Sequence, residues 1–398
     1  MPTNTLLTPS EITKEAQRVL HQKLNFIKRM NHSYDDRFAK SGAKIGDSLK
    51  IRLPSQYTVT DGAVLNVQDS EQQSVTLQVN NRKHVGMSFT DEELTLDMDR
   101  FSELHIEPAM AVLAAKVESD VIKNVYKDVY NQVNNVGSAG TLKLAGTVRK
   151  KLVDNLVPMD RTSTMILNTQ DNLDLVDAGK ALFNPTQAIT KQYLEGYIGR
   201  HSGFEYFENT LMPRHTTGSD DGTGDYLTDD ATAQTGSTLT VDTGTGTLKK
   251  GDIVTIAGVN RVHPETKEDT GQLQQFVITA DASASATSLS ISPAIVATGA
   301  KQNVTNGAAD DSAITKVGGA SAAHDISLGF HRDAFAFATA DLEMPRGVHR
   351  AAREVFDGIS LRYVEDFDIV NSAQRSRIDV LYGYKTLRPQ MACRFANN

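Results

Sequence analysis

The chain has 398 residues, enough for two or three domains, and its 39% hydrophobic content can build a core, which excludes a wholly disordered protein. No run approaches the ~18 apolar residues of a membrane span, and the single cysteine, Cys393, excludes an internal disulfide and a zinc site built on several thiolates. The net charge of -8 disfavours a simple DNA-binding protein, because such proteins need clustered lysine and arginine.

The charge is unevenly distributed along the chain. Residues 1–60 hold 10 basic and 5 acidic side chains, whereas residues 215–325 hold 6 basic and 14 acidic ones. Charged residues also occupy the first twenty positions, where a signal peptide would need an apolar stretch. We therefore expect a soluble, modular protein made in the cytoplasm, with a basic front and an acidic middle.

The N-terminal 40 residues are predicted to form an arm that contains a helix. Thr8-Pro9-Ser10-Glu11 supplies a helix start, and apolar residues follow at three and four spacing up to Ile27. From Asp47 to Phe89 the period changes to two, with a turn at Asp61-Gly62, which predicts a long two-stranded excursion. Because an isolated two-stranded ribbon is only marginally stable in water, we expect it to pack against another part of the structure, such as a neighbouring subunit.

The strongest element is a helix predicted over residues 107–133. Valines recur every four residues from Val117 to Val133, and Pro108 lies in the expected first turn. Residues 141–213 then alternate between helix and strand. We expect helices over 145–156, 169–183 and 186–198, with Asn168 as the cap of the second, and strands over 165–167 and 203–211.

The composition changes at His215 and becomes rich in serine, threonine and glycine up to Asp325. Four strand-like segments occur here, at 238–241, 252–256, 274–278 and 288–291, and they indicate a small all-β domain rather than one long disordered loop. Residues 326–398 return to a mixed pattern with strands at 334–337, 361–364 and 378–387. The insert therefore splits a second domain, and the fold class is α+β.

No catalytic motif is present in the sequence. His331-Arg332-Asp333 resembles the start of a kinase catalytic loop, but Ala338 stands where the asparagine is needed. The aspartates between 220 and 230 lack the closing glutamate of a calcium loop, so a solvated linker is the better interpretation, with a weak cation site as the alternative. His324 and His331 are best explained as satisfied structural histidines. We expect no enzyme activity, no cofactor and no metal.

Six segments carry a resemblance to a known family, and the last two are the most specific. They are EGYIGRHSGFEYFEN at 195–209, LMPRHTTG at 211–218, GDIVTIAGVN at 251–260, TGQLQQFV at 270–277, GFHRDAFA at 329–336 and VLYGYKTLRP at 380–389. The chain resembles tailed-bacteriophage major capsid proteins of the Hong Kong 97 type, and more narrowly the coat proteins of short-tailed phages that carry an inserted β-domain. The order of elements is similar over nearly the whole chain.

The resemblance implies a domain plan. It consists of an N-terminal arm at 1–40, an extended β-hairpin loop at 41–95, a peripheral domain with a spine helix at 96–144, the first part of an axial domain at 145–219, an inserted β-barrel at 220–322, and the rest of the axial domain with the returning peripheral strands at 323–398. The implied partners are further copies in hexamers and pentamers of an icosahedral shell, a scaffolding protein, a portal protein and, by non-specific proximity, packaged double-stranded DNA. The implied location is the virion capsid, after assembly in the host cytoplasm, with no membrane.

Two sets of residues are hypothetical contact sites under this resemblance. The charged hairpin at 260–272 is a candidate contact with a neighbouring subunit, and it holds Arg261, Glu265, Lys267, Glu268 and Asp269. The basic arm is a candidate contact with the scaffold, and it holds Lys14, Arg18, Lys23, Lys28 and Arg29. A purely solvating hairpin is the alternative for the first set, because surface ion pairs contribute only ~0–1 kcal/mol each.

Two other functions stay open at this level. A cellular nanocompartment shell of the same fold would capture a cargo enzyme and need no portal, and the inserted domain argues against it. An unrelated modular enzyme would need a cofactor or metal for which the sequence offers no ligand set.

Overall fold

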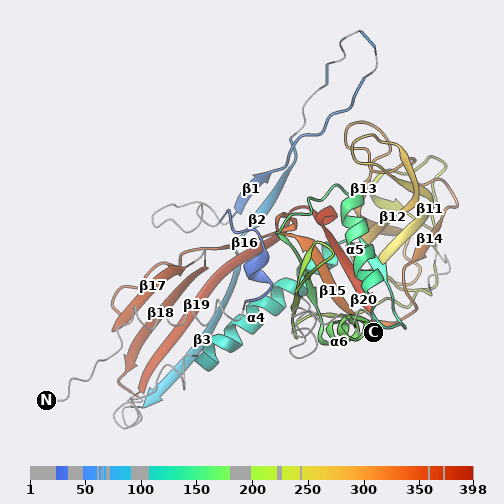
Figure 1. The fold of residues 1–398 in the computed structure, drawn as a ribbon. Coiled ribbons are helices and arrows are strands. Elements are labelled where there is room, and N and C mark those ends of the chain that lie inside the picture. The colour runs from blue at the N-terminus through green and yellow to red at the C-terminus, as the bar shows by residue number, and fades with distance from the viewer. Residues whose placement is uncertain are drawn as a thin grey trace. The chain divides into compact units, whose positions relative to one another are not determined.

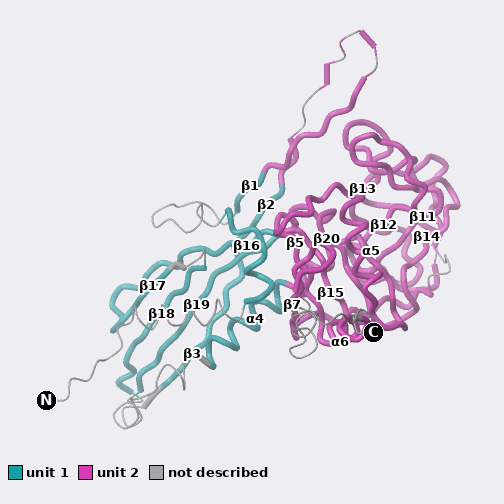
Figure 2. The backbone as a smooth tube through the Cα atoms, in the orientation of Figure 1, with its two compact units in different colours: residues 1–51, 75–121, 335–385 teal, residues 52–74, 122–334, 386–398 magenta. Residues whose placement is uncertain are grey.

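The computed structural model describes most of the chain. The described residues are 24–34, 48–60, 62, 63, 65, 67, 68, 72–90, 107–179, 199–221, 226–242, 244–356, 359–370 and 373–397. The chain divides into two compact units, shown in Figure 2. The first comprises residues 1–51, 75–121 and 335–385, and the second comprises residues 52–74, 122–334 and 386–398.

An antiparallel sheet and a long helix make up most of the first unit (Figure 1). The strands are β3 (Asn81–Thr90), β16 (Phe335–Thr339), β17 (Arg350–Phe356), β18 (Ile359–Asp368) and β19 (Ala373–Thr386). β19 pairs with β3, β16 and β18, and β17 follows β18 at the edge. The helix α4 (Glu107–Val125) is tied to this sheet by Asp120, which accepts a hydrogen bond from Tyr382 and lies 2.9 Å from the Lys83 ammonium.

The predicted helix over residues 107–133 is eight residues too long. Its apolar stripe is buried at Met110, Leu113, Val117 and Val121, as the spacing requires. After Val125, however, the chain turns through the 3-10 segment η3 (Tyr126–Asp128) and becomes extended. Of the two remaining valines, Val133 belongs to a strand, β4 (Gln132–Asn134), that pairs with the C-terminal strand, and Val129 lies in the extended chain just before it; β-branched side chains suit both positions.

The two-stranded excursion was predicted correctly for only part of its length. β1 (Ser48–Arg52) pairs with β2 (Ser74–Gln78) in a sheet of two strands. Residues 81–90 do not belong to this ribbon, because they form β3 and pair along their whole length with β19. Alternation of period two is the same in both settings, so the sequence could not separate them. Most of the predicted arm helix and the predicted helix at 186–198 lie outside the described residues; at 27–29 the chain forms a 3-10 turn, η1 (Ile27–Arg29).

A seven-stranded sheet forms one part of the second unit. Its strands are β4, β5 (Ser163–Leu167), β6 (Arg200–His201), β7 (Phe204–Glu208), β8 (Arg214–Thr216), β15 (Ala323–His331) and β20 (Ala392–Asn397). The helices α5 (Leu142–Asp154) and α6 (Thr169–Gly179) contact this sheet. A short 3-10 turn, η5 (Arg332–Ala334), follows β15, and another, η6 (Pro389–Met391), precedes β20. The predicted cap of α6 is confirmed, since the Asn168 side chain accepts the Asp171 amide at 2.6 Å.

A closed β-barrel forms the other part of the second unit. Its strands are β9 (Tyr226–Leu227), β10 (Gly236–Thr240), β11 (Ile253–Val262), β12 (Asp269–Ile278), β13 (Ser288–Ile295) and β14 (Ala313–Lys316). The sheet runs from β10 to β9, and its two ends meet through a bridge between Thr228 and Val241. A separate apolar core, which includes Tyr226, Phe276 and Ile278, fills the interior. All four strands predicted from the Ser/Thr-rich region fall within this barrel.

Candidate functional site

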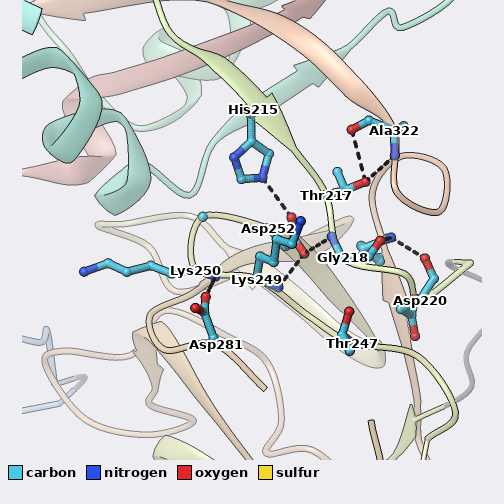
Figure 3. A network of polar contacts seen from close by, with 12 residues as sticks. His215, Thr217, Gly218, Asp220, Thr247, Lys249, Lys250, Asp252, Asp281 and Ala322 are labelled. Atoms are coloured by element: carbon cyan, nitrogen blue, oxygen red, sulfur yellow. Dashed lines mark hydrogen bonds and ion pairs between the residues drawn. The ribbon is translucent and has the colours of Figure 1, made fainter. Parts of the chain in front are cut away.

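Two short segments connect the barrel to the seven-stranded sheet, and we call them the neck: residues 214–220 on entry and 316–325 on exit. They pair with each other as antiparallel chain, with His324 opposite His215. The Thr217 hydroxyl donates to the Gly319 carbonyl at 2.8 Å. It also accepts the Ala322 amide at 2.9 Å (Figure 3). Both crossings into the barrel are therefore fixed by one hydrogen-bonded ladder.

Asp252 joins this neck to the barrel. Its side chain is fully buried at the start of β11, and its two oxygens accept the His215 Nε2–H at 2.8 Å, the Gly218 amide at 2.9 Å and the Lys249 amide at 2.8 Å (Figure 3). Burial raises the pKa of the Asp252 carboxyl, but the three donors outweigh burial and the net direction is downward. The residue therefore stays ionised at neutral pH and acts as a fixed anionic anchor.

Lys316 supplies the corresponding cation. It is 4% exposed, and its ammonium donates to the Gly218 carbonyl at 2.8 Å, to the Gly319 carbonyl at 3.2 Å and to the Asp220 carbonyl. Burial lowers the pKa of Lys316 and is the dominant influence, although Asp252 and Asp220 act in the opposite direction. Asp220 is itself buried, so the interpretation of residues 220–230 as a solvated linker is wrong for this position.

A second group of polar side chains lies on the sheet side of the neck. His215 is between Asp252 and Tyr126, whose hydroxyl is 3.1 Å from its Nδ1. Because Nε2 donates to the carboxylate, Nδ1 of a neutral ring accepts from the tyrosine. Arg394 is completely buried, donates to the Gly251 carbonyl at 2.8 Å and lies 5.8 Å from the centre of the Tyr126 ring.

His324 packs edge-on against His215 with a centroid separation of 5.6 Å. It is 2% exposed, and neither ring nitrogen has a hydrogen-bond partner in bonding geometry, although the Ala322 backbone lies close. The expectation of a satisfied structural histidine is therefore wrong for His324. It holds for His331, whose Nε2 is 2.8 Å from the Thr162 hydroxyl and 3.4 Å from the Asp160 carboxylate.

No local sequence pattern predicted this network of buried polar side chains. Asp252 is one of 14 acidic residues between 215 and 325, and nothing in its local pattern distinguishes it from the exposed ones. His215, Lys316 and Arg394 become neighbours only through strand pairing. The local signal at Arg394 is an arginine inside the apolar C-terminal strand.

The five residues of the hypothetical hairpin contact are found in two different environments. Arg261 is held within its own subunit by Asp154 at 3.5 Å and Asn155 at 3.3 Å. Lys267 donates to the Pro264 carbonyl at 2.7 Å and to the Gln302 carbonyl at 3.1 Å, and burial lowers its pKa. Glu265, Glu268 and Asp269 are exposed. The hairpin thus presents carboxylates to solvent and keeps its cations for internal contacts.

Only two of the five arm residues lie in the described part of the chain. Lys28 is exposed, and Arg29 is half-buried with a hydrogen bond to the Asn25 carbonyl at 3.2 Å. Lys14, Arg18 and Lys23 lie outside the described residues. The neighbouring Phe26 and Ile27 are buried, and the Phe26 amide donates to Glu118 of α4 at 3.0 Å.

The loop beyond the β1–β2 ribbon exposes apolar side chains. Tyr57, Val59, Leu65 and Val67 are each more than half exposed, and Val59 reaches 95%. Exposed apolar residues grouped on one loop indicate an interaction surface.

No group of three or more potential metal ligands occurs among the described residues. None of the helices described is long and apolar enough to cross a membrane. Cys393 is buried, and burial raises the pKa of its thiol to about 11, so it is not a reactive nucleophile at neutral pH.

Comparisons with known proteins connect these features to a family. A sequence model described as P22 coat protein, gene protein 5, matches residues 39–395. A search of curated proteins gives no significant match. Among solved structures, one from Mycobacterium phage Che8 is similar with 12% identity, a TM-score of 0.51 and coverage of 92% of this chain and 89% of that one.

Two further solved structures are capsids. The capsid of cyanophage P-SCSP1u shares 9% identity, with a TM-score of 0.47 and coverage of 92% of this chain and 87% of that chain. The mature capsid of bacteriophage PhiM1 shares 9% identity, with a TM-score of 0.46 and coverage of 93% and 87%.

Proposed function

Because the chain belongs to the P22 coat protein family and is a major capsid protein with the Hong Kong 97-type fold, we propose that its shell encloses the packaged double-stranded DNA of a tailed phage. Copies of the chain form the shell, and its place is the virion capsid. We propose that hexamers and pentamers assemble around a scaffolding protein with a portal at one vertex, in the host cytoplasm. The family match carries this proposal and favours it over a nanocompartment shell.

The structure supports an assembling role through surfaces that a single subunit leaves open. The loop of the β1–β2 ribbon exposes Tyr57, Val59, Leu65 and Val67, which cost free energy in water and are covered once another copy packs on them. We include in this proposal the domain plan inferred from the sequence, with the arm at 1–40 and the inserted barrel at 220–322. We also propose that the chain has no enzyme activity.

Electron microscopy of the purified chain tests the function. The chain is expressed alone and together with the candidate scaffolding protein of the same phage. We expect closed, uniform icosahedral shells, with higher uniformity when the scaffold is present. A monodisperse monomer or dimer under both conditions contradicts the assembly role. Shells that carry a cargo enzyme and no portal support the nanocompartment alternative.

We propose that the carboxylates of the 260–272 hairpin contact a neighbouring copy. Because Lys267 and Arg261 are engaged within the subunit, the exposed carboxylates of Glu265 and Glu268 are the available groups. Asp269 is also exposed but accepts hydrogen bonds from Asn260 and the Gly271 amide, and the partner of this acidic surface should be basic.

Reversing both charges, with Lys267→Glu and Glu268→Lys, is expected to weaken shells while leaving the monomer folded. Each lost pair contributes only ~0–1 kcal/mol, but the contact repeats in every copy of the shell. The measurement is the denaturant concentration at which shells dissociate. Glu268→Lys alone separates the intersubunit effect from the internal Lys267 contacts, and Asp281→Lys on another exposed turn is the control. Unchanged assembly and stability of the double variant contradict the contact.

We propose that the basic arm, with Lys14, Arg18, Lys23, Lys28 and Arg29, contacts the scaffold. An exposed electrostatic contact is screened over about 8 Å at physiological ionic strength and over about 3 Å at 1 M. Scaffold-assisted assembly, followed by light scattering, should therefore slow as salt rises. Lys28→Gln should reduce that salt dependence, since Lys28 is exposed. Assembly that is independent of salt contradicts the proposal.

A further inference from the structure

The neck brings buried cationic and titratable side chains together around Asp252, while a second buried carboxylate, Asp220, acts on Lys316. Four polar groups from four different elements meet there: His215 from β8, His324 from β15, Arg394 from β20 and Asp252 from the turn before β11. All four are at most 5% exposed. Asp252 is the only carboxylate hydrogen-bonded in this group, and its bonds go to His215 and two backbone amides.

The two groups nearest the sheet have unused hydrogen-bonding capacity. Arg394 uses Nη1 for the Gly251 carbonyl, while its buried Nε and Nη2 have no partner, and no ion pair of Arg394 occurs among the described residues. Neither nitrogen of His324 has a partner in hydrogen-bonding geometry, although the Ala322 backbone lies close enough to favour the protonated ring. A neutral His324 is tolerable in this position, but a protonated one would add a cation beside Arg394 and His215 with no anion of its own.

We propose that the neck is an acid-operated latch: with His324 neutral it holds the barrel against the seven-stranded sheet, and protonation of His324 releases it. The atoms held by the latch are the Gly218 and Lys249 amides and the Gly251 carbonyl, which bind Asp252 and Arg394 (Figure 3 shows Asp252 with the two amides). The proposal concerns the single subunit, so it stands or falls independently of the shell function.

The electrostatic environment of His324 gives the direction of the pH dependence. Burial, His215 and Arg394, in that order, lower the pKa of His324 to about 4, and Asp252 and the Ala322 backbone only partly oppose them. Once the neck opens, the ring is hydrated and its pKa returns to about 6.5. The open state therefore binds the proton first as the pH falls. Protection is complete above about pH 6.5 and is lost progressively below it.

Hydrogen–deuterium exchange of the full chain, corrected for the intrinsic pH dependence of exchange, tests the latch. In the wild type, peptides covering 214–220 and 246–252 should lose about tenfold in protection between pH 7.5 and pH 5.5, from the two pKa values above. Peptides covering the buried strand β5 should keep theirs. His324→Phe, which keeps an aromatic ring and cannot be protonated, should lose less than about twofold, and His201→Gln, at an exposed histidine, should behave as the wild type.

A second variant keeps the test decisive if His324→Phe does not fold. Arg394→Met removes the neighbouring cation and should bring the pKa of His324 in the closed neck nearer its ordinary value, so the loss of protection between the two pH values should be smaller than in the wild type. Three results overturn the latch: no pH-dependent loss in the wild type, an equal loss in His324→Phe, or an equal loss in β5.

Discussion

Gly383→Ala is expected to disrupt the first unit of the chain. Gly383 lies in β19 where the segment joining β2 to β3 passes directly over it, and an added Cβ atom would be 2.0 Å from the Gln78 carbonyl oxygen and 2.8 Å from the Val79 Cα. Both are backbone atoms, which cannot rotate away as a side-chain tip can. The chain must therefore shift, at a cost of about 3 kcal/mol or more, at the upper end of overpacking in a core.

The same substitution at Gly86 provides a matched control. Gly86 lies in β3, opposite Arg377 of the same β19 strand, and an added Cβ atom would meet only the Ser376 carbonyl oxygen at 4.0 Å. Gly86→Ala should change the free energy of unfolding by less than about 1 kcal/mol. Urea denaturation followed by circular dichroism, with the yield of assembled shells as a second readout, compares the two. Equal stability of both variants would show that the crossing segment moves aside freely.

Asp252→Ala should detach the barrel from the sheet, even at neutral pH. The variant leaves the His215 ring and the Gly218 and Lys249 amides without their acceptor, and each buried donor left unpaired costs about 1–3 kcal/mol. It also removes one nearby negative charge from Arg394 and from Lys316, although Asp220 still acts on Lys316. A loss of about 3–5 kcal/mol is expected, as for removal of one partner from a buried charge pair.

Two comparison variants identify the cause of this loss. Asp281→Ala removes an exposed carboxylate that accepts the Lys250 amide at 2.7 Å, and it should cost less than about 1 kcal/mol. Asp252→Asn keeps one acceptor oxygen and should give an intermediate value. Hydrogen exchange of barrel and neck peptides measures the local effect. If Asp252→Ala loosens only the barrel interior and leaves the neck protected, the anchoring role of Asp252 is wrong.

Local sequence patterns correctly predicted those helices and strands whose formation depends on residues nearby in the chain. Pro108 marked the start of α4 and its apolar spacing marked the buried face, Asn168 was predicted as the cap of the helix that begins at Thr169, and the barrel strands were predicted from short strand-like segments in a Ser/Thr-rich region. The segments near 329–336 and 380–389 also carried the resemblance that the family match confirms.

Long-range pairing decided what these patterns left open. The valines at 129 and 133 continue the helical spacing, yet they lie in and beside β4 because β20 offers an open edge there. Residues 81–90 show the same alternation of polar and apolar residues as the ribbon before them, yet they pair with β19. A period in the sequence records which side of an element is buried and carries no information on the partner that buries it.

The sequence by itself determined the α+β class, the strands of the acidic Ser/Thr-rich region and, through the resemblance, the coat-protein family. Only the tertiary structure decided how the barrel is attached to the seven-stranded sheet, because Asp252, His215 and Arg394 are far apart in the chain and meet through two strand pairings and one turn. The same holds for Gly383, whose need for glycine arises from a backbone that crosses it from residue 78. Burial of a charge or a close backbone contact depends on distance in space, which sequence spacing does not encode.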